Sequence, residues 1–575
     1  LTLSIGLLTA EIPEVVGAGF DSAAGHRLVW ILAVTAGAFA ALQAIGPAQF
    51  GVGRIVRRQI DEALLSRTLD DLMRPARVEH LEDPALQDLL TLIREGGAYR
   101  RGTPGGAAVW TVRLIEVYIR AIGGTVFLWV AFAWWAAVLL IAACLLSRRM
   151  IRRATIAFLW SIIDAHHLQI HRRSDYDEKL GIGPTTAKET RIFGLTSWLR
   201  DRFVADWDES VWPIHHTRNR LTLRVGVAHG LLLIACAALF ALAARAAAAG
   251  SIGLGALAVV VRSSFDLATL ASGGQWDWDL EFGTIELPQL AAIETHAVKA
   301  AMSAGTERPG PSVAMEVIRF EGTGFHYPGS DRDVLRDLDL SIPAGQSIAI
   351  VGPNGAGKTT LVKLLAGLYE PTAGRIAIDD KDLSALDPRH LHQQIAVIFQ
   401  DFVRYELPAR ENVAFGAVPY LDDDDALARA AARSGAEAVI EALPHGWDTV
   451  LSRQYARGAD LSGGEWQRVA LARCHLAIEA GARILVLDEP TASLDVREEA
   501  RFFDRFVELT EGLTTILISH RFSTVRAASR IVVLDEGRIR EDGAHDDLVA
   551  LGGIYAEMFQ MQAGRYRAAK EADAP

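Results

Sequence analysis

The residues best suited to chemistry lie in the segment GPNGAGKTT, residues 352–360. An apolar stretch typical of a strand precedes it and a helix-like stretch follows, which is the context that the GxxxxGK[ST] pattern requires. In such a loop, backbone N–H groups surround phosphate oxygens at a helix N-terminus, a lysine reaches the β- and γ-phosphates, and a hydroxyl group binds Mg²⁺. We therefore predict a phosphate-binding loop made of Gly352, Pro353, Asn354, Gly355, Ala356, Gly357, Lys358, Thr359 and Thr360. Thr359 is also a predicted Mg²⁺ ligand.

A second chemical pattern is ILVLDEP, residues 484–490. Its apolar residues predict a buried strand that ends in Asp488, where a carboxylate can complete a Mg²⁺ coordination shell. Glu489 follows directly, and a carboxylate at this place can orient and deprotonate an attacking water molecule. The alternative, a solvated acid at a strand end, does not explain why the pair follows a phosphate loop in the same chain.

A third pattern is LSGGEWQR, residues 461–468, a second glycine-rich loop that has no lysine. It cannot repeat the chemistry of the first loop, and its purpose depends on the rest of the chain.

The elements that carry these loops differ from those of the first half of the chain. Half of the 575 residues are hydrophobic, and the long uncharged runs lie before about residue 275. A helix needs about 20 mostly apolar residues to cross a bilayer. The candidate spans are 28–52, 107–128, 129–147, 222–246 and 251–273. The opening LTLSIGLL is too short for a span, and we expect it to be the end of a truncated first span.

The charges between these spans predict their orientation. Two long polar segments are rich in arginine: Arg54, Arg57, Arg58, Arg67, Arg74 and Arg77 in the first, and Arg148, Arg149, Arg152, Arg153, Arg172 and Arg173 in the second. By the positive-inside rule both segments are cytoplasmic, and six spans place everything after residue 275 on the same side. The sequence therefore predicts a multi-pass protein of the cytoplasmic membrane with its soluble half in the cytoplasm.

Both arginine-rich segments are longer than a turn requires, and helix-like stretches at 60–73, 85–95 and 185–207 indicate that the spans continue into the cytosol. We expect them to end in contacts with a partner. An amphipathic helix lying on anionic lipid remains an alternative for these residues.

Composition excludes some classes of protein. The formal net charge of −12 gives no general basic surface for nucleic acid. The three cysteines, Cys144, Cys236 and Cys474, are too far apart in sequence for a disulfide framework or a metal cluster, which favours buried free thiols.

The third pattern resembles a motif of a known protein family. LSGGEWQR resembles the signature sequence of the ATP-binding-cassette (ABC) family, and residues from about 315 to 563 are similar to that family's nucleotide-binding domain in the order of their motifs. The resemblance implies that Tyr327 stacks on adenine, that Gln400 is the Q-loop glutamine and a Mg²⁺ ligand, that Ser493 to Asp495 form the D-loop and that His520 is the switch histidine. Taken alone, Tyr327 would be a core aromatic residue and His520 a turn residue.

The family also implies a reason for the loop without a lysine. In it, two nucleotide-binding domains close head to tail, so that ATP on one phosphate loop is covered by the signature loop of the other chain. Ser462, Gly463 and Gly464 would then bind the γ-phosphate of a nucleotide that the partner holds. Because one chain has one loop of each kind, a working unit requires two chains, as a homodimer or a heterodimer.

Six spans followed by such a domain resemble the exporter branch of the family. The expected fold is a membrane α-helical bundle of six spans followed by an α/β P-loop ATPase domain with a helical subdomain. We expect a transmembrane domain over 1–300, a linker over 301–315, an ABC nucleotide-binding domain over 316–563 and a tail over 564–575. The stretches 80–95 and 185–204 resemble the coupling segments that press on the nucleotide-binding domains, the second on the partner's.

The sequence thus predicts an ATP hydrolase that couples ATP and Mg²⁺ to export by alternating access across the lipid bilayer. Uptake through an exporter-like architecture and a non-transporting membrane sensor are the alternatives. The substrate is open: an amphipathic peptide, a drug-like molecule or a lipid. Aromatic and acidic residues after the sixth span, Trp276, Asp277, Trp278, Asp279 and Glu281, would suit a cationic guest, or they form an interfacial anchor.

Overall fold

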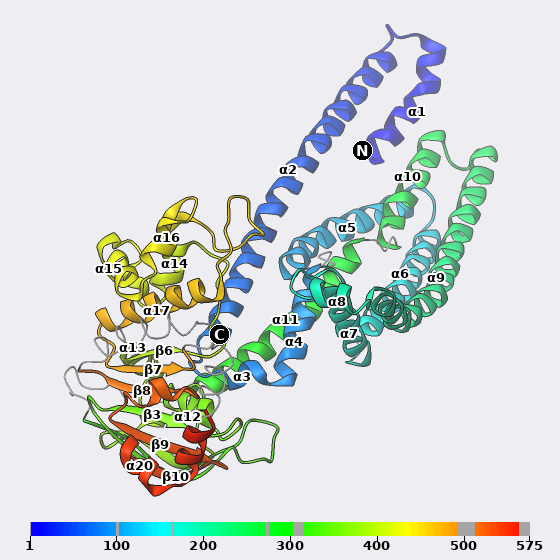
Figure 1. The fold of residues 1–575 in the computed structure, drawn as a ribbon. Coiled ribbons are helices and arrows are strands. Elements are labelled where there is room, and N and C mark those ends of the chain that lie inside the picture. Colours follow the sequence, from blue (N-terminus) through cyan, green and yellow to red (C-terminus); the bar gives the residue numbers. More distant parts are fainter. Residues whose placement is uncertain are drawn as a thin grey trace. The chain divides into compact units, whose positions relative to one another are not determined.

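The computed structural model describes residues 2–98, 103–163, 165–271, 275–302, 316–490 and 512–562 (Figure 1). It divides into two compact units. The first contains Leu1–Leu72 and Pro84–His296, and the second contains Met73–Asp83 and Ala297–Pro575. The second unit therefore includes a short piece of chain that lies between two helices of the first.

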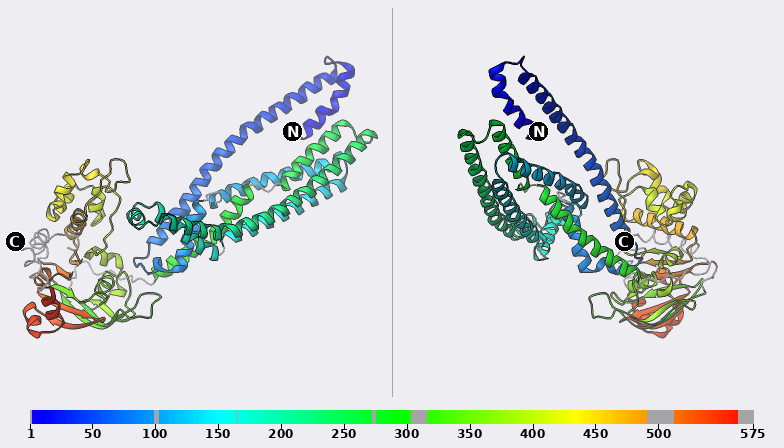
Figure 2. Two further views of the ribbon diagram at one scale, coloured as in Figure 1. Left: turned by 45° about the vertical axis from the view of Figure 1, so that its right-hand side comes forward. Right: turned by 180° about the vertical axis from the view of Figure 1, so that it is seen from behind.

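The first unit is helical throughout the part that the structure describes. Its helices are α1 (Thr2–Ala18), α2 (Ala23–Met73), α4 (Pro84–Ala98), α5 (Pro104–Ala131), α6 (Trp134–Ile163), α7 (Ala165–Ile182), α8 (Ala187–Ile192), α9 (Thr196–Ala248), α10 (Leu254–Ala271) and α11 (Gln275–Met302). Figure 2 shows α5, α6, α9 and α10 side by side, and α10 packs against α1, α5, α6 and α9.

Five of the described helices are long and apolar enough to cross a membrane, namely α2, α5, α6, α9 and α10. Each of the five spans expected from the sequence overlaps one of these helices, and the window 251–273 begins before α10. One boundary is corrected: the window 129–147 begins too early, because α5 continues to Ala131 and α6 starts only at Trp134. Uninterrupted apolar sequence hides this turn, which is formed by the backbone at Phe132 rather than by a glycine or a proline.

Two helices run far beyond a bilayer, as the sequence predicts. Helix α2 has 51 residues and α9 has 53, whereas about 20 suffice to span the hydrocarbon core. The expected helix 185–207 is wrong in one respect, because it is two helices. Helix α8 ends at Ile192, and Gly194 takes φ +64°, a left-handed conformation that stops the helix before α9 begins.

The second unit is an α/β domain with two sheets. The larger sheet has the order β10-β9-β3-β8-β7-β6, parallel except for the edge pair β10–β9, and the smaller antiparallel sheet has the order β2-β1-β4-β5. The strands are β1 (Val317–Phe325), β2 (Leu335–Pro343), β3 (Ser347–Val351), β4 (Ala373–Ile378), β5 (Lys381–Asp382), β6 (Ile395–Ile398), β7 (Ile484–Asp488), β8 (Thr514–Ile518), β9 (Arg530–Asp535) and β10 (Arg538–Gly543).

The helices of this unit are α3 (Glu79–Glu82), α12 (Lys358–Leu365), α13 (Pro388–Gln394), α14 (Ala409–Ala414), α15 (Asp424–Ser434), α16 (Glu437–Glu441), α17 (Gly463–Glu479), α19 (Phe522–Val525) and α20 (His545–Leu551). Helices α14 to α17 share a core of their own around Trp466 and Leu427, which forms the expected helical subdomain.

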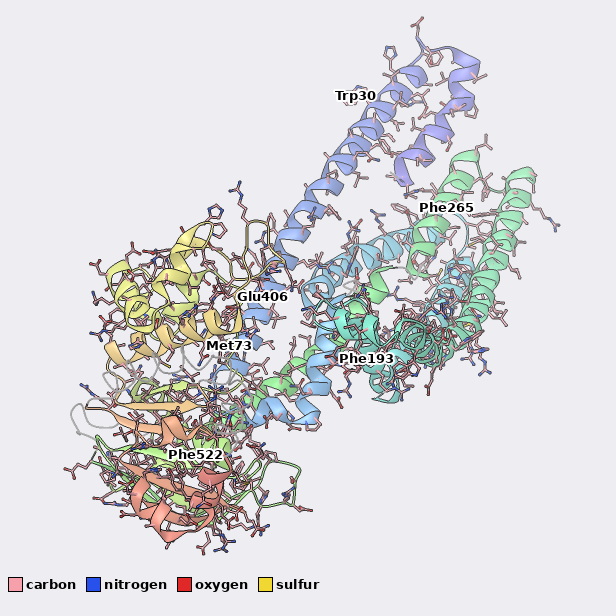
Figure 3. The ribbon with its side chains drawn as sticks, in the orientation of Figure 1. Trp30, Met73, Phe193, Phe265, Glu406 and Phe522 are labelled. Atoms are coloured by element: carbon pink, nitrogen blue, oxygen red, sulfur yellow. The ribbon has the colours of Figure 1, made fainter. Side chains whose placement is uncertain are left out.

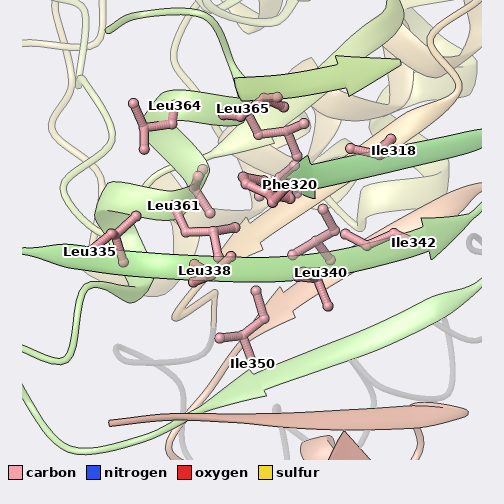
Figure 4. Packing of buried hydrophobic residues seen from close by; sticks show 14 of the residues in the cluster. Ile318, Phe320, Leu335, Leu338, Leu340, Ile342, Ile350, Leu361, Leu364 and Leu365 are labelled. Carbon is pink, nitrogen blue, oxygen red and sulfur yellow. The ribbon is translucent and has the colours of Figure 1, made fainter. Parts of the chain in front are cut away.

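The main core explains why the central strands are apolar on both faces. Residues such as Ile348 and Ile350 pack on one side against α12 and the antiparallel sheet (Figure 4). Alternate residues such as Ala349 and Val351 pack on the other side against Phe522 and Tyr555. This burial fixes β3, and with it the start of α12, in the middle of the domain.

Candidate nucleotide-binding site

The phosphate loop connects β3 to α12, as the sequence predicts. Its backbone requires glycine at two places. Gly352 lies so close to β9 that a Cβ atom there would be 1.9 Å from the carbonyl oxygen of Leu534. Gly357 takes φ +105° directly before the first helical residue, where a Cβ atom would be 2.6 Å from Leu335. The loop can therefore present its N–H groups at the start of α12.

Lys358 has its ammonium group inside this loop. Nζ donates hydrogen bonds of 2.9 Å to the carbonyl oxygens of Gly352 and Pro353. Burial lowers the pKa of Lys358, and the nearby Glu489 and Asp488 carboxylates oppose that shift. Lys358 thus lies within the electrostatic reach of both acids at the end of β7, so three of the predicted site residues meet.

Asp488 is the last residue of β7 and is 1% exposed. Among the described residues neither carboxylate oxygen has a hydrogen-bond partner of good geometry. Burial raises the pKa of Asp488, the Thr359 hydroxyl and Lys358 oppose this, and the negative charges of Glu489 and Asp401 add to it. A buried carboxylate beside a hydroxyl group, with more negative charge around it, is a fitting site for a divalent cation.

Glu489 and His520 lie together at the same edge of the sheet. His520 Nδ1 is 3.3 Å from Glu489 Oε1. Glu489 has φ +50°, a strained backbone conformation for this residue, and its N–H donates to the carbonyl oxygen of Ile518 on β8. Because β3, β8 and β7 are adjacent and parallel, their carboxyl ends bring the phosphate loop, His520 and the two acids to one edge.

Two further predicted residues lie nearby in the fold. Gln400 follows β6, the strand next to β7, and is exposed. Tyr327 follows β1, and its hydroxyl group is 3.0 Å from that of Thr360 in the phosphate loop. The Tyr327 ring packs edge-on against Tyr369 and lies 5.4 Å from it, centroid to centroid. It is thus partly a core aromatic residue, and stacking on adenine stays a prediction.

The signature loop forms the N-terminus of α17. Ser462 is the N-cap: its Oγ accepts from the Glu465 N–H, and Glu465 Oε2 accepts from the Ser462 N–H at 2.7 Å. Gly463 and Gly464 begin the helix. None of the hydrogen bonds among the described residues joins this loop to the phosphate loop of the same chain.

Residues 73–83 contact this unit through a segment that begins before the predicted coupling stretch 80–95. Tyr369 donates to Glu82 at 2.6 Å, the Glu370 N–H donates to Glu79, and Arg77 forms an ion pair of 2.5 Å with Glu370. Arg77 and Glu79 lie before the predicted stretch, and Glu82 lies within it. The sequence predicts only an orientation in the membrane from Arg77, and no sequence pattern marks Tyr369 and Glu370.

Some of the remaining predicted site residues lie outside the described part of the chain, and others contact side chains of the protein. Asp495 lies outside the described residues, and so do the side chains of Trp276, Asp277 and Trp278. Asp279 accepts a hydrogen bond of 2.6 Å from Trp110, and Glu281 forms an ion pair of 2.7 Å with Arg152. Because these two acids already contact side chains of the protein, they give little support to a cationic guest.

A comparison with known proteins bears on this geometry. Residues 335–492 match the family model described as ABC transporter. This part of the chain is an ABC domain. The match runs from β2 through the phosphate loop, the signature loop and the two acids at the end of β7.

The ABC domain has many curated relatives. It is similar to an ATP-dependent lipid A-core flippase of Chromohalobacter salexigens, 41% identical over 246 residues, which are 43% of this chain and 41% of that protein. It is also similar to an uncharacterized ABC transporter ATP-binding protein, YwjA, of Bacillus subtilis, 39% identical over 248 residues. The match to YwjA covers 43% of this chain and 42% of YwjA. The chain thus spans about two fifths of the length of the curated relatives that it matches.

The likeness in fold extends over almost the whole chain. The structure of a bacterial Atm1-family ABC exporter with ATP bound superposes with a TM-score of 0.76 at 24% identity, covering 98% of this chain and 95% of the other. The ABC domain is therefore joined to a membrane bundle with the fold of an ABC exporter half, and the chain is a multi-pass membrane protein whose ABC domain lies in the cytoplasm.

Proposed function

We propose that the chain is an ATP-driven half-transporter that works as a dimer and exports an amphipathic substrate. The observation that carries this proposal is the meeting of Lys358, Asp488, Glu489 and His520 beside one phosphate loop, in a chain whose fold is that of an exporter half. A membrane-coupled ATP hydrolase needs each of these parts.

In this proposal each residue has a chemical role. The backbone of residues 352–357 and the Lys358 ammonium group hold the phosphates of ATP, in place of the two carbonyl oxygens that Lys358 contacts here. Glu489 accepts a proton from the attacking water, and His520 orients Glu489 or the γ-phosphate through its imidazole N–H. Tyr327 would stack on adenine, and Asp495 would contact the opposite site.

Thr359, Asp488 and Gln400 would hold Mg²⁺, which supplies positive charge to the β- and γ-phosphates. The fit rests on the buried Asp488 carboxylate, whose oxygens have no hydrogen-bond partner of good geometry among the described residues and which lies beside the Thr359 hydroxyl. The described residues contain no group of three or more His, Cys, Asp or Glu side chains that could hold a metal. A Mg²⁺ ion that is shared with a phosphate needs fewer protein ligands, so this agrees with the proposal.

A second copy of the chain would complete the site. Ser462, Gly463 and Gly464 present the N-terminus of the 17-residue helix α17, which favours an anion, yet no hydrogen bond links them to the phosphate loop of their own chain. Closure of two ABC domains around ATP would then move residues 73–83, which are attached through Tyr369 and Glu370, and so change the membrane bundle.

The substrate and its direction belong to the proposal as well. The relatives named lipid A-core flippases favour a lipid or another amphipathic molecule over a small ion. Uptake, for example of a siderophore, and a sensor without transport remain the alternatives from the sequence.

The test uses the purified chain in proteoliposomes with a fluorescent phospholipid in both leaflets. Added ATP reaches only those chains whose ABC domains face outward. We expect ATP to move the lipid from the outer to the inner leaflet, which is export in cellular terms. Movement in the opposite direction would favour uptake, and ATP hydrolysis without movement of this lipid or of a peptide probe would favour a sensor.

A further inference from the structure

Helix α10 carries two charges in the middle of a membrane span. Arg262 is the ninth of its 18 residues, about 13 Å from either end at the rise of an α-helix. Asp266 follows one turn later. Charged side chains at this depth are costly in contact with lipid tails, so they face the interior of a bundle or a cavity that contains water.

The two charges form a pair in which the acid is already satisfied. Arg262 Nη2 lies 3.1 Å from Asp266 Oδ1, and the Thr2 hydroxyl on α1 donates to Asp266 Oδ2 at 2.8 Å. The Asp266 side chain is 13% exposed and that of Arg262 is 40% exposed. The more exposed charge of the pair is therefore the guanidinium group. Its Nε atom is buried and makes no hydrogen bond within the described part of the chain.

An apolar side chain lies on the same face of the helix. Phe265, three residues after Arg262 and labelled in Figure 3, is 59% exposed. Its ring centroid lies 6.4 Å from that of Phe240 on α9. Residues three apart are neighbours on a helix surface. This face of α10 thus combines an accessible guanidinium group with an exposed aromatic ring, which suits a molecule that has an anionic head and an apolar body.

We infer that Arg262 binds the anionic head group of the transported molecule, with Asp266 and Thr2 holding the guanidinium group in place and Phe265 contacting the apolar part. The substrate class is therefore an amphipathic anion, a phosphate ester or a carboxylate, and not the cationic guest that the acids near residue 279 suggested. This inference rests on the proposed function.

The test measures ATP hydrolysis by the full chain in nanodiscs with three probes that share a 12-carbon tail: dodecyl phosphate, dodecanoate and dodecyltrimethylammonium, each below its critical micelle concentration. We expect the two anions to stimulate hydrolysis at lower concentrations than the cation. Arg262→Gln should raise the half-maximal concentration of the anions by about tenfold or more, because one charged hydrogen-bond donor is lost. If the half-maximal concentration of dodecyl phosphate is lower than that of dodecanoate, the head group is a phosphate ester. If that of dodecanoate is lower, the head group is a carboxylate.

Arg245→Gln is the matched control, because Arg245 is an exposed arginine in the last turn of α9. It should keep the wild-type preference for anions. Arg262→Lys keeps the charge and should give an intermediate loss, which provides a second variant should Arg262→Gln fail to fold. Equal stimulation by anions and cation in the wild type, or an equal shift for all three probes in Arg262→Gln, would overturn the inference. If the inference fails in this way while the wild-type chain still hydrolyses ATP, the proposed function stands. If the wild-type chain does not hydrolyse ATP, both the inference and the proposed function are excluded.

Discussion

At the scale of single residues, Glu489 is the proposed base of the ATP site and lies 3.3 Å from His520. Glu489→Gln keeps the size of the residue and a hydrogen-bonding oxygen near His520 but removes the basic group. We expect turnover to fall by roughly 10² or more while ATP still binds. Steady-state hydrolysis and equilibrium binding of a fluorescent ATP analogue measure the two effects, and near-normal hydrolysis would exclude Glu489 as the base.

A second residue links the stability of the ABC domain to pH. His475 on α17 is 4% exposed, its Nε2 atom has no hydrogen-bond partner among the described residues, and burial, with a contribution from Arg433, lowers its pKa to about 4. An unfolded chain binds a proton at this residue near pH 6.5, whereas the folded domain does not. Stability should therefore fall as the pH drops from 6.5 towards 4, by roughly 1 to 3 kcal/mol, and should not change on this account above pH 6.5.

Scanning calorimetry of the full chain checks this, using the transition that ATP shifts upward. His475→Leu should flatten the dependence of that transition on pH between 6.5 and 4.5. His445→Leu, at an exposed histidine of the same subdomain, should retain it. An unchanged slope in His475→Leu would show that other groups cause the loss of stability in acid.

At the scale of elements, the tip formed by α8 and the turn after it is the part of the second cytoplasmic segment best suited to contact a partner. Ile192 is 79% exposed and Phe193 is 69% exposed. Figure 3 labels Phe193 in this turn. Phe193→Asp should leave ATP binding intact and lower the amount of lipid moved per ATP, because a charge forced into an apolar socket costs several kcal/mol unless it is paired.

Tyr176→Asp provides the control for this substitution, because Tyr176 is a similarly exposed aromatic residue on α7 of the same segment. It should move as much lipid per ATP as the wild type does. If Phe193→Asp transports with unchanged stoichiometry, the tip is a helix that faces lipid, which is the alternative left open by the sequence.

The elements also show what the sequence can predict and what it cannot. The phosphate loop, β7 with Asp488 and the start of α17 have strong local signals, because glycines, apolar strands and N-caps act within a few residues. The sequence does not predict the turn at Phe132, because apolar sequence continues through it. It does not predict the break at Gly194 either, because helix-like sequence continues on both sides. Arg77 and Glu79 contact Glu370, and Glu82 contacts Tyr369, so this attachment depends on residues about 290 positions apart, which no local pattern reports.

At the scale of the whole molecule, the proposed function requires two chains, because each phosphate loop would need a signature loop from a partner. Two defective chains can test this. Lys358→Ala removes the ammonium group from the phosphate loop, and Gly464→Asp places a negative charge in the signature loop. Either variant alone should form a dimer in which both ATP sites are damaged.

The most direct measurement is ATP hydrolysis by a dimer that contains one chain of each variant, purified with two affinity tags. If the sites form between chains, one site of the mixed dimer joins the intact phosphate loop of one chain to the intact signature loop of the other. We then expect the mixed dimer to recover up to about half of the wild-type turnover if the two sites act independently, and in any case to exceed either parent. If each site forms within one chain, the mixed dimer has no intact site, and turnover no higher than that of the parents would contradict the central claim.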